Sequence, residues 1–302
     1  MNGILIIDKP AGITSHDVVS RVRRILKTKR VGHTGTLDPF ATGVMVILVG
    51  QATRLAQFLD KDAKAYEAIV RFGFETDTGD RTGSPKSKVQ SPKSLVVEDI
   101  REALKGFRGE IDQTPPMYSA KKVEGKKLYE LARKGQTIER KAVKVRIDEL
   151  EILSEPPASA GGTAMGIEAA TLRVVCSAGT YIRTLAEDIG RKIGTGAHLT
   201  ELRRTAAGRF SISESITLDE LADMSEPVGH LIPMEEAVSH LAKIELTGER
   251  AAKTRNGLST RIYDVAFAES EAIQMLDETG SLIAVGFYDA AENVVQPKVV
   301  LV

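Results

Sequence analysis

The sequence contains a single cysteine, Cys176, and no tryptophan among its 302 residues. One thiol cannot form an internal disulfide, and it cannot supply the several cysteine ligands of a Cys-based zinc site. No run of about 18 apolar residues occurs, so the sequence predicts no membrane-spanning helix. Residues 1–10 also lack the basic start, the apolar stretch and the cleavage site of a signal peptide. These absences favour a reducing, cytoplasmic location.

The whole chain has a net charge of zero, but its charged residues are unevenly distributed along the sequence. Lys and Arg total 41, and Asp and Glu also total 41. Residues 212–302 hold 16 acidic and 6 basic residues, which leaves 25 acidic and 35 basic residues in 1–211. A split of this size is typical of a chain in which one part binds a polyanion and another part has a different task. Chance clustering of surface charge is the alternative explanation.

Hydrophobic periodicity predicts both helices and strands in the first 240 residues, without a regular βαβ rhythm. We therefore predict an α+β fold, with a mixed, largely antiparallel sheet flanked by helices. A strand is expected at each of 3–8, 44–49, 66–72, 143–153 and 170–176, and a helix after a cap at Thr14 or Ser15 and at 51–59, 97–107 and 180–193.

The last sixty residues contain only short segments with strand character, at 272–276, 282–288 and 298–302. A short helix is expected between Pro233 and Ala242. We predict a large domain over 1–240, which would be the catalytic one, and a small β-rich domain over 241–302. Polar segments at 84–94 and 156–162 are expected to be loops.

A glycine-punctuated segment, Gly32–Gly43, reads Gly-His-Thr-Gly-Thr-Leu-Asp-Pro-Phe-Ala-Thr-Gly. Its glycines permit tight turns and close approach to a ligand, and Pro39 biases Asp38 towards an extended backbone. The segment presents a carboxylate on a stiff loop before an apolar strand, although Asp-Pro is also common in ordinary surface turns. It lacks the Gly-Lys-Ser/Thr ending of a phosphate-binding loop, and the five histidines show no metal-ligand spacing.

This segment closely resembles the signature loop of the bacterial tRNA pseudouridine-55 synthases, the TruB type of pseudouridine synthase. Over about residues 3–210 the resemblance is supported by several further motifs. These are Asp8-Lys-Pro-Ala-Gly12, Tyr66, Thr76-Asp-Thr-Gly-Asp80, Pro116-Met-Tyr-Ser-Ala120, Gly125-Lys-Lys-Leu-Tyr129, Gly179-Thr-Tyr-Ile-Arg-Thr184 and Ala197-His-Leu-Thr-Glu-Leu-Arg-Arg204. The resemblance implies the pseudouridine synthase fold, with a PUA-like domain at the C-terminus where the pattern is loosest.

The resemblance also implies roles for individual residues. Asp38 would attack the target nucleotide, Tyr66 would stack on the flipped uracil and take part in proton removal, and Arg183 would pair with Asp38. Leu202 would form an apolar wall of the base pocket, Tyr181 would pack under the active site, and His33 would hold the region around the flipped base. From local patterns alone, Tyr66 reads as a core aromatic and Arg183 as an exposed arginine at a helix start. The neighbouring loop residues Gly32, Thr34 and Gly35 would contact the substrate.

The implied reaction isomerises uridine 55 in the T-loop of tRNA to pseudouridine. It involves no redox change and consumes no phosphate, so we expect neither a cofactor nor a metal. A carboxylate can serve as the nucleophile, and an adjacent guanidinium favours its ionised form. The expected partner is the T-arm stem-loop of tRNA, with no membrane and no obligate protein partner, and with a monomeric chain.

Two basic segments fit such a partner. Residues 21–30 carry six basic residues, and residues 117–146 carry ten against three acids, as expected of an RNA-binding insertion. A solvated helix face is the alternative for each. Two other functions remain open: a subunit of an RNA-guided pseudouridine synthase, and an RNA-binding protein that helps tRNA fold without modifying it.

Overall fold

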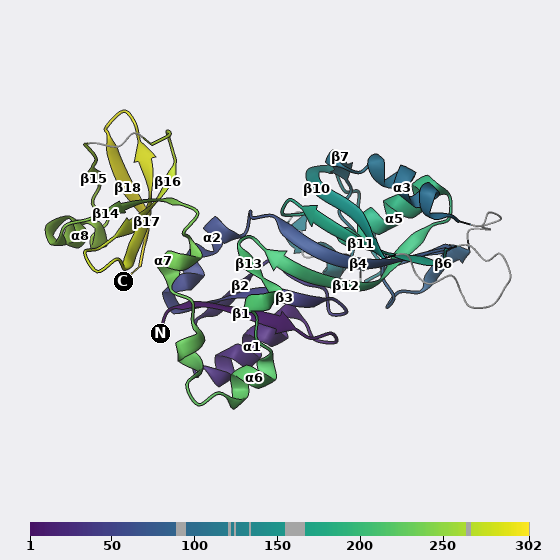
Figure 1. Ribbon diagram of the computed structural model, residues 1–302, viewed down its shortest axis with the longest axis horizontal. Coiled ribbons are helices and arrows are strands. Elements are labelled where there is room, and N and C mark those ends of the chain that lie inside the picture. The colour runs from purple at the N-terminus through teal and green to yellow at the C-terminus, as the bar shows by residue number, and fades with distance from the viewer. Residues whose placement is uncertain are drawn as a thin grey trace.

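The computed structural model describes residues 1–88, 95–119, 122–123, 125–132, 134–154, 167–263 and 267–301. The loop predicted at 156–162 and part of that predicted at 84–94 lie outside these residues. Within them, two sheets dominate, and Figure 1 shows them at opposite ends of the long axis.

The larger sheet has nine strands in the described part of the chain, with seven in the order β1-β3-β12-β4-β11-β10-β7. All of its pairs are antiparallel except that of β3 with β12. This confirms the predicted mixed, largely antiparallel sheet. Its strands are β1 (Gly3–Lys9), β2 (Val31–Thr34), β3 (Thr42–Val49), β4 (Lys64–Phe72), β7 (Gly109–Gln113), β10 (Val143–Ser154), β11 (Ala169–Cys176), β12 (Ala197–Ala207) and β13 (Phe210–Ser211).

The helices that begin at residues 15, 97, 182 and 218 pack on one face of this sheet, whereas the short helices at 56–59 and 234–237 pack on the other face beside β1 and β3. The first begins at the predicted cap, where the Thr14 hydroxyl accepts from the Asp17 amide at 3.1 Å. The described helices are α1 (Ser15–Ile25), α2 (Ala56–Leu59), α3 (Val97–Lys105), α4 (Leu128–Ala132), α5 (Ile182–Ile193), α6 (Leu218–Asp223), α7 (Met234–Ala237) and α8 (Gly248–Arg255), with 3₁₀ turns at Gly50–Leu55, Ile212–Glu214 and Pro227–His230.

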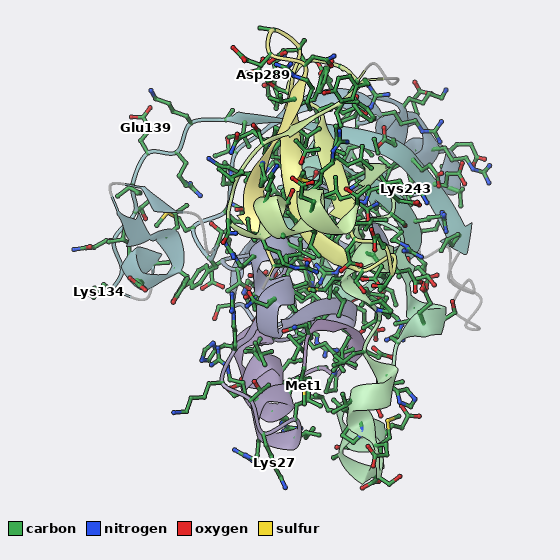
Figure 2. All side chains as sticks on the ribbon, turned by 90° about the vertical axis from the view of Figure 1, so that its left-hand side faces the viewer. Met1, Lys27, Lys134, Glu139, Lys243 and Asp289 are labelled. Carbon is green, nitrogen blue, oxygen red and sulfur yellow. The ribbon has the colours of Figure 1, made fainter. Side chains whose placement is uncertain are left out.

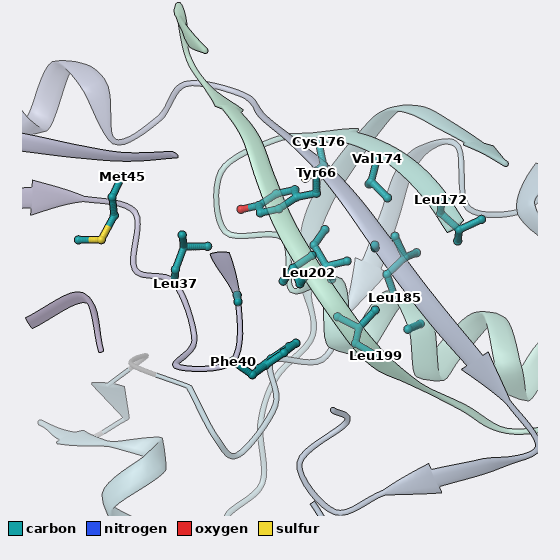
Figure 3. Close-up of a cluster of buried hydrophobic side chains, with 14 of the residues drawn as sticks. Leu37, Phe40, Met45, Tyr66, Leu172, Val174, Cys176, Leu185, Leu199 and Leu202 are labelled. Atoms are coloured by element: carbon teal, nitrogen blue, oxygen red, sulfur yellow. The ribbon is translucent and has the colours of Figure 1, made fainter. Parts of the chain in front are cut away.

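Strands β1 and β3 are apolar on both faces because each face packs on a separate core. Leu5 and Ile7 belong to the core under α1 and α5, whereas Ile4 and Ile6 belong to a second core on the opposite face. A strand that is buried on both sides reads as a continuous apolar run instead of an alternating one. Figure 3 shows part of the first core, where Leu37, Phe40, Tyr66 and Leu202 gather beside β4 and β12.

The C-terminal sheet has five strands in the order β14-β16-β17-β18-β15. Its apolar residues Leu282, Val285 and Val299 pack in the second core against β1 and β3. The ring centroids of Phe287 in β17 and Phe58 in α2 also lie 6.2 Å apart. The β-rich C-terminal region is therefore confirmed, and it is joined to the large sheet by an apolar contact. Its strands are β14 (Ala242–Glu245), β15 (Thr260–Arg261), β16 (Ala272–Leu276), β17 (Leu282–Asp289) and β18 (Val294–Val300).

Several local predictions were wrong. Val31–Thr34 is strand β2, not part of a loop, and the segment predicted as a loop at 84–94 contains strand β6 (Pro85–Lys88), which pairs with β5 (Phe74–Thr76). The final strand, β18, begins at Val294, four residues before the predicted start. A further small hairpin joins β8 (Lys122–Val123) and β9 (Lys126–Lys127). The largest omission is β12, which lies in the middle of the sheet.

None of the helices in the described residues is long and apolar enough to cross a membrane.

Candidate active site

The loop that carries Asp38 is fixed from two sides by buried polar residues. The Ser15 hydroxyl accepts from the Leu37 amide at 2.9 Å and lies 3.1 Å from the Leu37 carbonyl, to which it donates. The fully buried Lys9 ammonium donates to the Ala41 carbonyl at 2.7 Å and to the Pro39 carbonyl at 3.3 Å. The chain on both sides of Asp38 is therefore held in place before any substrate binds.

The side chain of Asp38 pairs with Arg183 through two bonds. Arg183 Nε lies 2.8 Å from Asp38 Oδ2, and Nη2 lies 3.2 Å from Oδ1. Two parallel contacts fix the plane of the carboxylate as well as its position. Sequence reasoning placed these two residues together from a resemblance, and the structure brings them together across 145 positions of the chain.

Arg183 is only 5% exposed, whereas its position at a helix start suggests an exposed residue by sequence alone. Its remaining donors bind the Thr78 carbonyl at 2.9 Å and the Tyr118 carbonyl at 2.6 Å. Because these carbonyls belong to two separate loops, the guanidinium cannot rotate without breaking bonds to both. It therefore presents a fixed positive charge to Asp38.

A second carboxylate, Asp80, completes the network. Its Oδ2 lies 3.8 Å from Arg183 Nη1, and its Oδ1 accepts from the Thr82 amide and the Thr78 hydroxyl, both at 2.9 Å. Asp80 is 4% exposed. The sequence places Asp80 in a family-like motif but predicts no role for it. Its contacts identify it as a residue that positions Arg183.

Opposing influences act on the Asp38 carboxyl. Burial raises the pKa of Asp38 above its ordinary value, Arg183 lowers this pKa, and Asp80 raises it. Arg183 cannot lose its proton, so its charge favours the carboxylate form at any relevant pH. The site thus holds a carboxylate that is 33% exposed and whose main compensating charge is one guanidinium.

The pocket beside Asp38 has a volume of about 260 Å³, near the lower end of small-molecule sites, which are roughly 300–1,000 Å³. Tyr66 and Leu202 lie on adjacent strands and form part of its wall, and both are less than a tenth exposed. Figure 3 shows the Tyr66 ring and Leu202 close together beside β12. Burial raises the pKa of the Tyr66 hydroxyl, while the Arg204 guanidinium lowers it.

Tyr181 reaches the same pocket at the start of α5. Its amide donates to the Gln113 side chain at 2.7 Å, and its carbonyl accepts from that side chain at 3.0 Å. The buried Gln113 amide therefore fixes the backbone two residues before Arg183. Tyr181 positions the helix start as well as lining the pocket.

The other residues predicted to contact the substrate do not all line the Asp38 pocket. Gly35 lines the Asp38 pocket with a φ of +64°, and His33 lines an adjoining cavity of about 640 Å³ on the other side of Asp38. Burial lowers the pKa of His33, which favours its neutral form. Gly32 and the buried Thr34 lie on β2 and do not line either of these two pockets. Their roles, like those of the other site residues, stay predictions.

Lys64 and Arg204 also line the Asp38 pocket, although sequence reasoning gave neither a role. A signal for Lys64 was present, because the alternation at Tyr66, Ala68, Val70 and Phe72 extends back to it. Arg204 follows Leu202 at the same period along β12. Among the described residues, no group of three or more His, Cys, Asp or Glu side chains is arranged to hold a metal ion.

Comparison with solved structures gives similar folds over nearly the whole chain. A Cbf5-Nop10-Gar1 complex contains a chain with a TM-score of 0.75 and 26% identity, covering 99% of this chain and 85% of that one. An H/ACA RNP bound to a substrate RNA containing 2'-deoxyuridine gives 0.74 and 25%, with the same coverage.

Family comparison gives the class: pseudouridylate synthases. Residues 23–182 match "TruB family pseudouridylate synthase (N terminal domain)", and residues 183–239 match "tRNA pseudouridylate synthase B C-terminal domain". The chain belongs to the TruB family. Among its relatives, the tRNA pseudouridine synthase B of Bacillus pumilus is 43% identical, covering 100% of this chain and 98% of that protein. That of Solibacter usitatus is 44% identical and covers 100% of both.

Proposed function

We propose that this chain isomerises uridine to pseudouridine in tRNA, at uridine 55 of the T-loop, with Asp38 as the nucleophile. The observation that carries the proposal is the two-bond pair of Asp38 and Arg183, set in a pocket walled by Tyr66 and Leu202. Family membership and full-length relatives named tRNA pseudouridine synthase B support the reaction and the substrate class.

The chemistry assigns a task to each member of the pair. The bond between uracil N1 and ribose C1' breaks, the base turns, and a new bond joins C5 to C1'. Asp38 adds to the nucleotide as a carboxylate, at the sugar or at the ring, and leaves when the new bond is complete. Arg183 keeps the carboxylate ionised and oriented, and the proton leaves C5 in the final step.

The pocket walls suit an extruded base. A base inside a folded loop must leave its stack, and stacking on an aromatic ring returns roughly 1–3 kcal/mol. Tyr66 provides that ring, and Leu202 and Tyr181 line the same pocket. His33, Gly32, Thr34 and Gly35 lie on the segment leading to Asp38, where they would contact the neighbouring nucleotides.

Two exposed basic surfaces are suited to the phosphates of the T-arm. Arg21, Arg24, Lys27, Lys29 and Arg30 are exposed on and after α1. Within the insertion at 117–146, Lys134 and Glu139 lie away from the body of the molecule, as Figure 2 shows. Cations in such positions orient an RNA without selecting a base.

We further propose the division of the chain into a catalytic domain (1–240) and a PUA-like domain (241–302). The five-stranded sheet and the family match that ends at residue 239 support this division. The protein would act in the cytoplasm, as a monomer and without an obligate protein partner.

Tritium release tests the proposal. An unmodified tRNA transcript with tritium at uridine C5 is incubated with the wild type, with Asp38→Asn and with Asp219→Asn. The last variant removes an exposed carboxylate of α6 and serves as the matched control. We expect release from the T-loop position with wild type and Asp219→Asn, and a loss on the order of 10⁴-fold with Asp38→Asn.

Each other outcome contradicts a definite part of the proposal. Tight tRNA binding without release by the wild type would favour an RNA-folding protein or a subunit that needs a guide RNA. Release that persists in Asp38→Asn would remove Asp38 from the nucleophile role. Release at another uridine would leave the reaction intact and overturn the assigned position.

A further inference from the structure

Two buried cations, Lys64 and Arg204, line the same pocket as Asp38. Their exposed fractions are 6% and 1%, and Arg204 is among the largest fully buried side chains of the protein. Charged side chains are almost never buried to this extent unless they are paired. Both residues therefore need an explanation.

Neither cation forms an ion pair with a carboxylate in the part of the chain that the structure describes. The Lys64 ammonium donates to the Asp60 carbonyl at 2.7 Å and to the Asp62 carbonyl at 2.5 Å. Arg204 donates to the Val44 carbonyl at 2.7 Å and to the Gly35 carbonyl at 2.9 Å. None of the ion pairs found within the described ranges involves Lys64 or Arg204. Backbone carbonyls satisfy hydrogen bonds but leave the net positive charge in place.

The two cations lie together at one side of the pocket. A side chain added at Gly35 would be 3.1 Å from Arg204 Nη1 and 3.8 Å from Lys64 Cε, so both flank this glycine. Arg204 is directly opposite Tyr66 in the pairing of β12 with β4, and Lys64 lies two residues before Tyr66. The positive charge is therefore adjacent to the aromatic ring on which the base would stack.

Burial lowers the pKa of Lys64, while the nearby Asp62 raises it. Burying a charged side chain without an ion-pair partner costs free energy. Retaining two such charges beside an active-site carboxylate is an arrangement more typical of a functional site than of a structural core.

The reaction in the proposed function supplies the missing negative charge. If Asp38 attacks ribose C1', the electron pair of the broken bond leaves with N1 and the uracil becomes an anion. If Asp38 attacks ring C6, the electron pair moves through C5 onto O4 and leaves an enolate. In both routes the ring carries negative charge until C5 bonds to C1'. Loss of the C5 proton and protonation of N1 then give neutral pseudouridine. Both routes therefore gain from a fixed positive charge next to the ring.

We propose that Lys64 and Arg204 form a cationic wall that stabilises the negative charge on the uracil ring during isomerisation. This inference rests on the proposed function and assigns two further residues to its site. Lys64 acts directly on the ring. Arg204 acts on the ring and also orients the Tyr66 hydroxyl.

Single-turnover rates with saturating enzyme test the role of Lys64. Lys64→Met keeps the length of the side chain and removes its charge, Lys64→Arg keeps the charge, and Lys61→Met is the matched control at an exposed position three residues earlier. We expect Lys64→Met to slow isomerisation about 10²-fold, the typical effect of one electrostatic donor. Its dissociation constant for tRNA should stay within about twofold, and Lys64→Arg should retain more activity than Lys64→Met.

A substrate with 5-fluorouridine at the target position separates charge stabilisation from a structural effect. Fluorine withdraws charge from the ring, so the ring anion depends less on the protein. The C5-linked product is followed by mass spectrometry of the nucleosides, since fluorine blocks only the final proton loss. We expect Lys64→Met to slow conversion of 5-fluorouridine by less than a tenth of the factor found for uridine.

The outcomes are distinct. Lys64→Met within threefold of the wild type on uridine would overturn the proposal, as would equal slowing on both substrates, which would indicate a structural role. A wild-type protein that is inactive on tRNA would overturn the proposed function itself. Should Lys64→Met not fold, as judged by circular dichroism, Lys64→Gln provides the same test with an uncharged donor.

Discussion

The regions around the two sheets differ in whether charged side chains are buried. Around Asp38, the charged side chains of Lys9, Lys64, Arg183 and Arg204 are buried and held by backbone carbonyls. In the C-terminal sheet, the buried polar side chains found in the described residues are uncharged: Thr254, Thr260 and Gln274. The acidic residues of 212–302 that the structure describes are all exposed or partly exposed.

This difference separates two uses of charge that the composition alone does not distinguish. A buried charge has a fixed position and fixed partners, so its substitution should affect chemistry or folding strongly. A surface charge contributes to the field around the protein and is screened by salt within about 10 Å at 0.1 M. Substitutions in the two regions should therefore differ in size and in salt dependence.

The largest expected effect is on turnover, from Arg183→Lys. Lysine cannot reproduce the two-bond contact with Asp38 or the bonds to Thr78 and Tyr118, so we expect a loss of about 10³-fold or more, or ~4 kcal/mol. Because Arg183 lowers the pKa of Asp38, the acidic limb of the pH profile should also move to higher pH. Arg191→Lys, a half-exposed position two turns along α5, is the control and should stay near wild type. A loss below tenfold in Arg183→Lys would contradict the pairing role.

A smaller effect, on stability alone, is expected from Leu282→Ala in the contact between the two sheets. Leu282 is 4% exposed in the core shared with β1 and β3, and truncation of such a leucine costs about 2–5 kcal/mol. Urea unfolding should show this loss, while single-turnover activity at low temperature stays unchanged. Leu258→Ala, more than half exposed in the same region, should change little. An unfolding transition for residues 242–301 separate from the rest would show that the contact does not couple the sheets.

A pH-dependent effect of intermediate size is expected at Lys9. Burial lowers the pKa of Lys9 to about 8 from 10.5, with Asp38 opposing this shift. Between pH 8 and 10.5 the unfolded chain therefore binds more protons than the folded chain, so this group adds stability as pH rises. Relative to Lys9→Met, the free energy of unfolding of the wild type should increase by about 2 kcal/mol from pH 7 to pH 9.5. A difference that stays constant over this range would mean that Lys9 is charged throughout in the folded protein.

The smallest effect is expected from the acidic surface. Replacing Asp219, Asp223 and Glu226 by their amides should change stability by no more than ~0.5 kcal/mol, because all three lie at the surface. Affinity for tRNA should rise a few-fold at low salt and return to the wild-type value at high salt. Filter binding across a salt series measures both. A change in affinity that does not depend on salt would point to a specific contact.

The sequence predicted strands well where polarity follows burial. The alternation in β4 and the apolar run of β3 both gave strands within two residues of their observed starts. It failed at β12, whose residues 197–207 include Glu201, Arg203 and Arg204. Arg204 is buried there because β3 and Gly35 supply carbonyls from 160 or more positions away, and no local pattern encodes those partners.

The same reasoning applies to the site. Asp38 and Arg183 were identified through motifs that resemble a family, whereas the cations around them were missed. Burial of Lys9, Lys64 and Arg204 depends on carbonyls contributed by turns and by distant strands. A hydrophobicity pattern assigns lysine and arginine to the surface, so it fails where the backbone of another segment satisfies them.

The central position of β12 has a consequence for biosynthesis. Its backbone runs parallel to β3 at Thr42 and Gly43, and a side chain at Gly43 would lie within 2.2 Å of the Arg204 carbonyl oxygen. The segment next to Asp38 thus has its close partner some 160 residues later in translation. A nascent chain that ends before β12 has emerged from the ribosome carries the nucleophile without Leu202 or Arg204 of its pocket. Because such distant pairing forms late, the chain gains its catalytic geometry only after two thirds of it has been made.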